Sequence, residues 1–391
     1  MTKIRIGVFL TTIVLVTIVA SLVGLYARGY RFDSNTLKFV PNGIFVVKSD
    51  PDGAQIYVDG ELETATNATL RLPPGTYDVS IQKDGFLTWS KRIVIDKEVV
   101  TEAEAQLFRA APSLSAVTFA GVINPVVSDD NTKIAYSVPL QGTNGLDKAG
   151  LWVVETVNLP IGFARDPKRI SDGNLANATW QWSPDGRELL VTTATGAFLL
   201  DTGEYTPQAS WINIASQVET ILAEWEEERE RKMLAQIRPL PEAMREILAN
   251  QVTNIRFSPD ENKVMYTARV NVNIPNDLIK PVPGASTQRQ ERDIKEGRTY
   301  IYDIKEDRNF LIEENPVDKR LSWFATSSHV IVAKPGEIVI RDYDGTNSQV
   351  VYSGSYEAPH AFPTFSDERL LFLTNLGATG TNPNLYSLSL K

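Results

Sequence analysis

The sequence contains two histidines and no cysteine, so few side chains are available for nucleophilic or general-base chemistry. His329 begins an apolar segment, and His360 lies in the segment Pro359-His360-Ala361-Phe362-Pro363. Neither has a serine and an acid in a nucleophile arrangement, and the Gly-x-Ser-x-Gly turn of serine hydrolases does not occur. The pattern therefore predicts no catalytic residue, and we expect a protein that is not an enzyme.

Two acidic pairs have the spacing with which a calcium loop can begin, Asp50-x-Asp52-Gly53 and Asp342-x-Asp344-Gly345. A calcium loop also needs further oxygen ligands and a bidentate acid near its twelfth position. The residues after Gly345 supply no such acid. Since Asp-Gly is also a common hairpin dipeptide, we interpret both segments as turns and predict neither a metal site nor a cofactor.

Aromatic side chains could instead bind a sugar by stacking or a partner protein by apolar contact. Trp180, Trp182 and Trp323 stand beside turns of a repeat, where the core needs bulky side chains. Trp89 and Trp225 are not explained in that way. We therefore take Trp89 and Trp225 as candidate partner contacts.

A repeated turn indicates the elements that hold these residues. An apolar residue, a turn beginning with serine and a short apolar strand recur along the chain, and Trp323-Phe324 marks a fifth, divergent repeat. Four-stranded units that repeat in this way are typical of a β-propeller. We expect five blades, with six as the alternative. The four turns are Ser128-Asp129-Asp130-Asn131, Ser183-Pro184-Asp185-Gly186, Ser258-Pro259-Asp260-Glu261 and Ser366-Asp367-Glu368.

These turns, together with the hairpin around Asp344-Gly345, resemble the repeats of TolB-type propellers, and the resemblance covers residues 114–391. It implies a scaffold that binds partners on a rigid face. The last repeat is one strand short, and Leu114 to Phe119 could supply that strand and close the ring.

Two stretches exceed the repeat length. Residues 214–250 carry Val218, Ile221, Leu222 and Trp225 at helical spacing, and prolines interrupt the pattern before it resumes. We predict a helical hairpin inserted in the propeller, which either packs locally or docks a partner. Residues 273–297 are rich in proline and are predicted to form an exposed loop.

Residues 43–107 alternate apolar and polar positions between glycine-containing turns, which is typical of a small all-β domain. The order of these turns resembles a PEGA domain, beginning with its Pro-x-Gly-Ala turn. This resemblance implies a β-sandwich that serves as a non-catalytic module of the bacterial envelope, and residues 108–113 would link it to the propeller. The motif positions are Pro51, Asp52, Gly53, Ala54, Asp59, Gly60, Pro74, Gly75, Tyr77, Gly85 and Phe86.

An almost unbroken apolar run extends over residues 6–26. At 1.5 Å per residue such a helix spans about 31 Å, the thickness of a bilayer core. We predict a signal-anchor with a cytoplasmic tail at residues 1–5 and a juxtamembrane stalk at residues 27–42. The remaining domains would lie outside the cytoplasmic membrane of a bacterium. Basic residues flank both ends of the run, so charge does not decide the orientation.

Composition narrows the function further. The 391 residues are 42% hydrophobic and 22% charged, which is typical of a folded protein, and the net charge of −9 argues against a nucleic-acid partner. We predict an all-β, non-enzymatic envelope scaffold that binds another envelope protein through the propeller face or the 214–250 insert. The alternative is a protein that binds cell-wall glycan through Trp89 and aromatic side chains of the loops.

Overall fold

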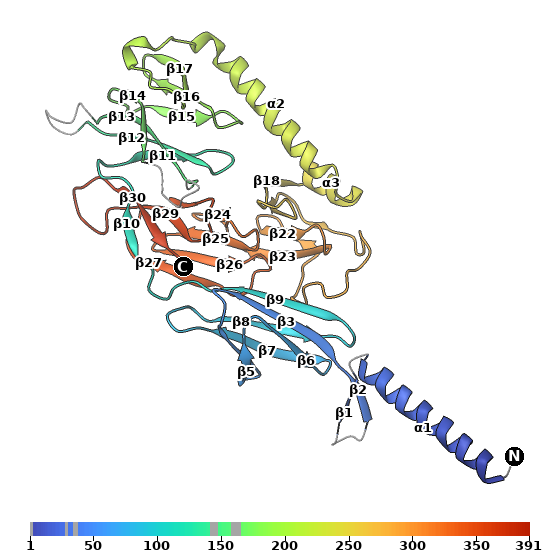
Figure 1. Ribbon diagram of the computed structural model, residues 1–391. Coiled ribbons are helices and arrows are strands. Elements are labelled where there is room, and N and C mark those ends of the chain that lie inside the picture. Colours follow the sequence, from blue (N-terminus) through green and yellow to red (C-terminus); the bar gives the residue numbers. More distant parts are fainter. Residues whose placement is uncertain (1–2, 28–29, 34–37, 141–147, 158–165) are drawn as a thin grey trace. The chain divides into compact units, whose positions relative to one another are not determined.

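The computed structural model describes residues 3–27, 30–33, 38–140, 148–157 and 166–391, and Figure 1 shows its elements. The chain divides into two compact units. Unit 1 comprises residues 1–107 and 280–289, and unit 2 comprises residues 108–279 and 290–391. Sheets form the core of each unit, as an all-β class requires.

The first element is helix α1 (Lys3–Ala27). Its segment Gly7–Gly24 has a mean hydropathy of 2.3 and no buried residue, so the helix is long and apolar enough to cross a membrane. After α1 in the chain, β1 (Tyr30–Asp33) pairs antiparallel with β2 (Lys38–Pro41). The predicted stalk at residues 27–42 therefore includes a small sheet, and residues 28–29 and 34–37 of it lie outside the described residues.

Residues 43–106 of unit 1 form a sandwich of two sheets with strand orders β6-β3-β9 and β5-β4-β7-β8. Alternation along the strands sends every second side chain into the space between the sheets, where Phe45, Ile56, Ile81 and Trp89 are each at most 1% exposed. The strands are β3 (Gly43–Asp50), β4 (Gln55–Val58), β5 (Glu61–Ala65), β6 (Ala68–Leu72), β7 (Gly75–Gln82), β8 (Trp89–Ile95) and β9 (Val100–Gln106).

The turns of this sandwich lie where the motif places them. Asp59 and Gly60 connect β4 to β5 with φ angles of 50° and 87°, and two successive positive φ values are what a two-residue hairpin needs. In the Pro51–Ala54 turn Gly53 has a φ of 71° and Ala54 is fully buried.

The predicted loop at 273–297 is only partly exposed. Residues 281–284 are exposed, whereas residues 285–288 are half-buried within unit 1. There the Val94 N–H donates to the Thr287 hydroxyl over 3.3 Å, and the Gln288 amide donates to the Arg92 carbonyl over 2.6 Å. The prediction of a fully exposed loop is therefore wrong, because hydrogen bonds hold its second half against β8.

The described residues of unit 2 form five sheets of three or four strands, numbered here in chain order. Sheet 1 is β11-β12-β13-β14, sheet 2 is β15-β16-β17, sheet 3 is β18-β19-β22-β23 and sheet 4 is β24-β25-β26-β27. Sheet 5 is β28-β29-β30, completed by β10, which pairs with β30 as predicted for Leu114 to Phe119. The number of blades stays a prediction.

The bounds of the strands that build these sheets, and of the small β20–β21 pair, are as follows. They are β10 (Leu114–Ala116), β11 (Ile123–Val127), β12 (Lys133–Val138), β13 (Gly150–Glu155), β14 (Lys168–Asp172), β15 (Thr179–Trp182), β16 (Glu188–Thr193), β17 (Gly196–Asp201), β18 (Val252–Phe257), β19 (Lys263–Ala268), β20 (Val272–Asn273), β21 (Asp293–Ile294), β22 (Thr299–Asp303), β23 (Arg308–Glu313), β24 (Arg320–Trp323), β25 (His329–Lys334), β26 (Glu337–Asp342), β27 (Gln349–Ser353), β28 (Ala361–Pro363), β29 (Arg369–Thr374) and β30 (Asn384–Ser389).

The repeated turn joins the first and second strands of a sheet through one buried hydroxyl. The Ser183 hydroxyl donates to Asp185 over 2.7 Å and accepts the Glu188 N–H over 2.9 Å. The fourth turn residue, Gly186, has a φ of 66°. Ser258 makes the same two bonds in sheet 3, at 2.6 and 3.0 Å.

In sheet 5 the turn is shifted by two residues from its predicted place. Pro363 pairs with Leu370 as Trp182 pairs with Leu189, so Thr364 occupies the position of Ser183. Its buried hydroxyl donates to the Arg369 carbonyl over 2.8 Å. The prediction that Ser366 holds this turn is wrong, because a threonine two residues earlier offers the same buried hydroxyl.

Most sheets of unit 2 pack directly on their neighbours. Trp180 and Trp182 of sheet 2 join the apolar core shared with sheet 1, and Trp323 of sheet 4 joins the core shared with sheet 3. Sheet 5 packs on sheet 1 through Phe362, and its Phe372 ring lies 4.5 Å from that of Tyr352 in sheet 4.

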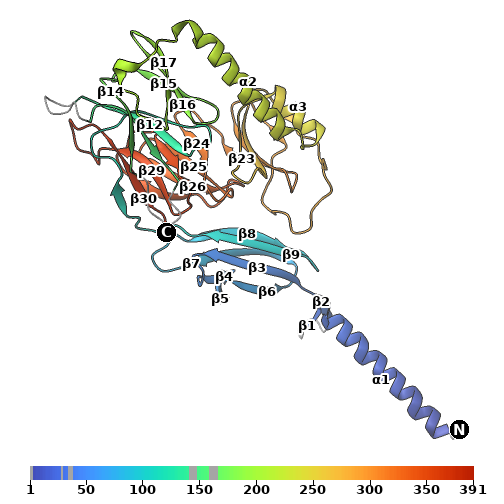
Figure 2. The same cartoon turned by 45° about the horizontal axis from the view of Figure 1, so that its top comes forward.

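Sheets 2 and 3 are the exception, because the helical insert covers the faces that they turn toward each other. Helix α2 (Val218–Ile237) packs Trp225 on Leu190 and Ala197 of sheet 2. Helix α3 (Glu242–Asn250) and the end of α2 pack on Tyr266 and Tyr300 of sheet 3. Figures 1 and 2 show α2 running from the edge of β17 to β18. Two short 3-10 helices, η2 (Gln208–Ser210) and η3 (Ala215–Gln217), precede it.

The shared turn geometry predicts which hydroxyls stabilise unit 2. Ser183→Ala leaves the buried Glu188 N–H without its acceptor and should lower the free energy of unfolding by about 1–2 kcal/mol. Thr364→Val should also destabilise the protein, whereas Ser366→Ala should have little effect. Denaturant titrations of the full-length protein in detergent micelles measure all three, and equal effects at Ser366 and Thr364 would contradict the shifted turn.

The destabilisation caused by Ser183→Ala should depend on pH. The Ser183 hydroxyl holds the pKa of Asp185 below its usual value, and the Arg187 backbone N–H adds to this effect. A lowered folded-state pKa stabilises the protein above the unfolded pKa, and this contribution is lost as the pH falls through the folded value. The difference between wild type and Ser183→Ala should therefore shrink below about pH 4.

Candidate functional site

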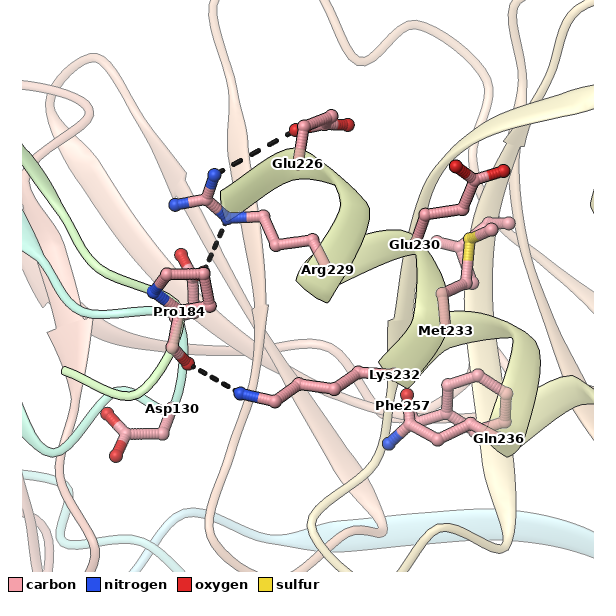
Figure 3. Close-up of a pocket in the computed structure, with 11 residues that line it drawn as sticks. Asp130, Pro184, Glu226, Arg229, Glu230, Lys232, Met233, Gln236 and Phe257 are labelled. Atoms are coloured by element: carbon pink, nitrogen blue, oxygen red, sulfur yellow. Dashed lines mark hydrogen bonds and ion pairs between the residues drawn. The ribbon is translucent and has the colours of Figure 1, made fainter. Parts of the chain in front are cut away.

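A cavity of about 770 Å³ lies in unit 2 beneath helix α2, and Figure 3 shows the side chains around it. Its floor is formed by sheet 3, its wall by the turns of sheets 1 and 2, and its cover by α2. We call it the α2 cavity. Its lining residues are Asp129, Asp130, Pro184, Glu226, Arg229, Glu230, Lys232, Met233, Gln236, Ile255 and Phe257.

The cavity exists because one residue of sheet 3, Phe257, lacks the packing partner that its counterparts have. Phe257 pairs with Val264 at the position where Trp182 and Trp323 stand in sheets 2 and 4. Those two tryptophans are at most 6% exposed and fill the space against the preceding sheet. Since α2 keeps sheet 2 away from sheet 3, Phe257 is only half-buried and lines a cavity instead.

Helix α2 is held over the cavity by polar contacts with three turns. Arg229 donates to the Asp129 carboxylate and to the Trp182 carbonyl, both over 2.8 Å. Lys232 donates to the Pro184 carbonyl over 3.0 Å, as Figure 3 shows, and Gln236 donates to Glu261 over 2.9 Å. The helix thereby connects the turns of sheets 1, 2 and 3.

The charge that remains in the cavity is negative. Both cations are paired, Arg229 with Asp129 and Lys232 with Glu228 at 2.8 Å. Burial acts to raise the pKa of Asp130, but hydrogen bonds from Ser128 and Thr132 outweigh it, so the pKa is lowered and Asp130 stays ionised at neutral pH. Glu230 has no ion pair within the described part of the chain. Beside these acids, Met233, Ile255 and Phe257 offer apolar surface.

Neither tryptophan that we predicted as a partner contact is available for that role. Trp89 is 1% exposed inside the sandwich of unit 1, and Trp225 is 8% exposed between α2 and sheet 2. Both rings fill the apolar core of their own unit. The glycan alternative thereby loses Trp89 as a stacking residue, and its loop aromatic side chains stay a prediction.

The histidines have partners that the sequence spacing did not reveal. His329 Nδ1 lies 2.7 Å from the Thr326 hydroxyl, and His329 Nε2 lies 3.4 Å from Asp342. The acid beside His329 comes from the neighbouring strand and is therefore not visible in the sequence around the histidine. The histidine is 4% exposed, and the Phe108 and Phe324 rings lie against it at 5.8 and 6.4 Å. A substrate therefore has no approach to this arrangement.

The described residues contain no group of three or more His, Asp or Glu that could hold a metal ion. The Asp344-Gly345 segment forms the β26–β27 hairpin, in which Gly345 has a φ of 82° and Asp344 accepts the Thr346 N–H over 3.1 Å.

One protein-family model matches part of the chain. Residues 42–110 match the PEGA domain family. The match confirms the predicted resemblance at residues 43–107. No curated protein matches the chain.

TolB, whose repeats the turns resemble, is among the similar solved structures. TolB from Acinetobacter baumannii is 12% identical over 80% of this chain and 59% of its own, with a TM-score of 0.23. Acylaminoacyl peptidase from Pyrococcus horikoshii is 13% identical over 70% of this chain and 39% of its own, with a TM-score of 0.22. Oligogalacturonate lyase from Vibrio parahaemolyticus is 11% identical over 92% of this chain and 96% of its own, with a TM-score of 0.22. TM-scores this low support no conclusion about activity, so the function has to be inferred from the site.

The contacts of Arg229 predict how α2 is held. In Arg229→Gln the bonds to Asp129 and the Trp182 carbonyl weaken, so backbone amides at residues 226–236 should exchange deuterium faster than in wild type. Arg231→Gln is the matched control, because Arg231 is exposed on the same helix and does not line the cavity. Equal exchange in both variants would show that the polar contacts do not hold the helix.

Proposed function

We propose that this protein is a non-enzymatic recognition protein, anchored in the cytoplasmic membrane of a bacterium, that binds another envelope protein in the α2 cavity. A PEGA domain and a TolB-like fold are compatible with an envelope-associated, protein-binding role. The observation that carries the proposal is the cavity itself, where more acids than bases and the half-buried apolar side chains of Met233, Ile255 and Phe257 lie beneath one helix.

The lining determines which partner fits. A segment with Lys or Arg next to an apolar residue would place its cation near Asp130 and Glu230 and its apolar side chain on Met233 and Phe257. Few contacts of this kind dominate the affinity of protein interfaces, and opposite charge across the interface raises the association rate. The segment would therefore be basic and apolar, in agreement with the acidic net charge of the chain.

Site-specific crosslinking tests this proposal. A photoreactive residue at Met233, in the full-length protein in intact membranes, should capture a discrete partner. The double variant Glu226→Lys, Glu230→Lys should abolish the crosslink by repelling the partner's cation. Glu224→Lys changes the same charge at an exposed residue of α2 outside the cavity and should leave the crosslink intact. A crosslink that survives the double reversal would overturn the proposal.

The proposed topology has its own test. The chain contains no cysteine, so a single introduced thiol reports its own location. Ser210→Cys, at an exposed residue of unit 2, should react with a membrane-impermeant maleimide in intact spheroplasts. Lys3→Cys should react only after permeabilisation. The reverse pattern would place unit 2 in the cytoplasm.

A further inference from the structure

Sheets 3, 4 and 5 of unit 2 each carry a basic side chain on or next to the strand β18, β24 or β28, respectively. Arg256 lies on β18, Arg320 begins β24, and His360 directly precedes β28. Since neighbouring residues of a strand point to opposite faces, Arg256 points away from the α2 cavity that Ile255 and Phe257 line. Its guanidinium donates instead to the Leu321 carbonyl over 2.8 Å, next to Arg320.

Phe362 connects the second and third of these groups. The Arg320 guanidinium lies 5.1 Å from the centre of the Phe362 ring, and the His360 ring stacks on it at 5.9 Å with 30° between the planes. Both basic groups thus lie beside one aromatic side chain. A guanidinium that stacks on a ring keeps its N–H groups free to donate at its edge.

These basic groups lack anionic partners. Within the described residues, neither Arg256 nor Arg320 forms an ion pair with a carboxylate, and the buried His360 Nδ1 has no hydrogen-bond partner. Among the described residues, Asp129 acts on Arg256 and Glu357 acts on His360 as negative charges at longer range. Arg256 is exposed, whereas Arg320 is half-buried, and an unpaired guanidinium group in a half-buried place is costly unless an anion joins it.

We propose that Arg256, Arg320 and His360 form a binding site for an oxyanion, a carboxylate or a phosphate group. Two guanidinium groups can each donate two hydrogen bonds to such a group. The site is separate from the α2 cavity, since none of its three residues lines that cavity.

The titration behaviour of these groups agrees with the geometry. Burial and the nearby Arg256 lower the pKa of Arg320 to about 10. Burial lowers the pKa of His360, Arg320 lowers it further and Glu357 opposes them. An anion between Arg320 and His360 would favour the protonated imidazole and raise the pKa of His360.

Histidine NMR tests this proposal with little ambiguity, because the full-length chain has two histidines. The full-length protein in detergent micelles, labelled at histidine, is titrated with pH in acetate, in inorganic phosphate, or in chloride at equal ionic strength. The signal that disappears in His360→Gln belongs to His360. The buried His329 gives the other signal and reports whether each variant is folded.

Acetate or phosphate should raise the pKa of His360 saturably, whereas chloride should not. A response to acetate alone would identify a carboxylate site, and a response to phosphate alone a phosphate site. In Arg320→Gln or Arg256→Gln the anion should bind about tenfold more weakly or worse, and Arg231→Gln should behave like wild type. Equal shifts in all three salts, or an unchanged response in both arginine variants, would overturn the proposal while leaving the crosslink at the α2 cavity unaffected.

Discussion

The apolar face of sheet 2 that carries Leu190, Ala197 and Leu199 must be kept from water, and α2 performs this task in place of sheet 3. Two sheets that pack directly lie about 10 Å apart, whereas a helix with its side chains is itself about 10–12 Å across. A helix between two sheets therefore keeps them apart along their whole length. The space that remains between the helix, sheet 3 and the turns of sheets 1 and 2 is the α2 cavity.

The sequence of α2 follows from this position. Trp225, Arg229, Lys232 and Gln236 are spaced by four, three and four residues, so they lie on one face of the helix. That face is apolar where it meets sheet 2 and becomes polar where it meets the backbone carbonyl groups of the turns. One helix face thus buries a sheet and binds the turns, which explains why a helix with a strongly charged sequence can pack stably against a propeller.

Much of this fold could be predicted from the sequence because its signals are local. The Ser183 turn depends on residues within five positions of one another, and the Asp59-Gly60 hairpin depends on two neighbours. The site could not be predicted in this way. Whether Trp225 is exposed depends on the face of sheet 2, which lies more than twenty residues earlier in the chain. Ser366 matches the sequence pattern of the turn, but Thr364 provides the buried hydroxyl. Helical spacing shows that a face exists but does not identify what that face packs against.

Comparison between the sheets separates structural residues from functional ones. His329 and Asp342 look like part of a catalytic arrangement, but they are register partners in sheet 4 just as Lys263 and Asp303 are in sheet 3. The distance from the basic nitrogen to the carboxylate oxygen is 3.4 Å in sheet 4 and 3.7 Å in sheet 3. The same buried pair therefore occurs at the same place in two sheets. Phe257 shows the opposite case. It occupies a position that is buried in sheets 2 and 4 and yet lines a cavity, because α2 takes the place that sheet 2 would otherwise fill. In a protein built from repeats, a residue of the usual type that borders an empty space is a stronger indication of function than an unusual residue in a packed core.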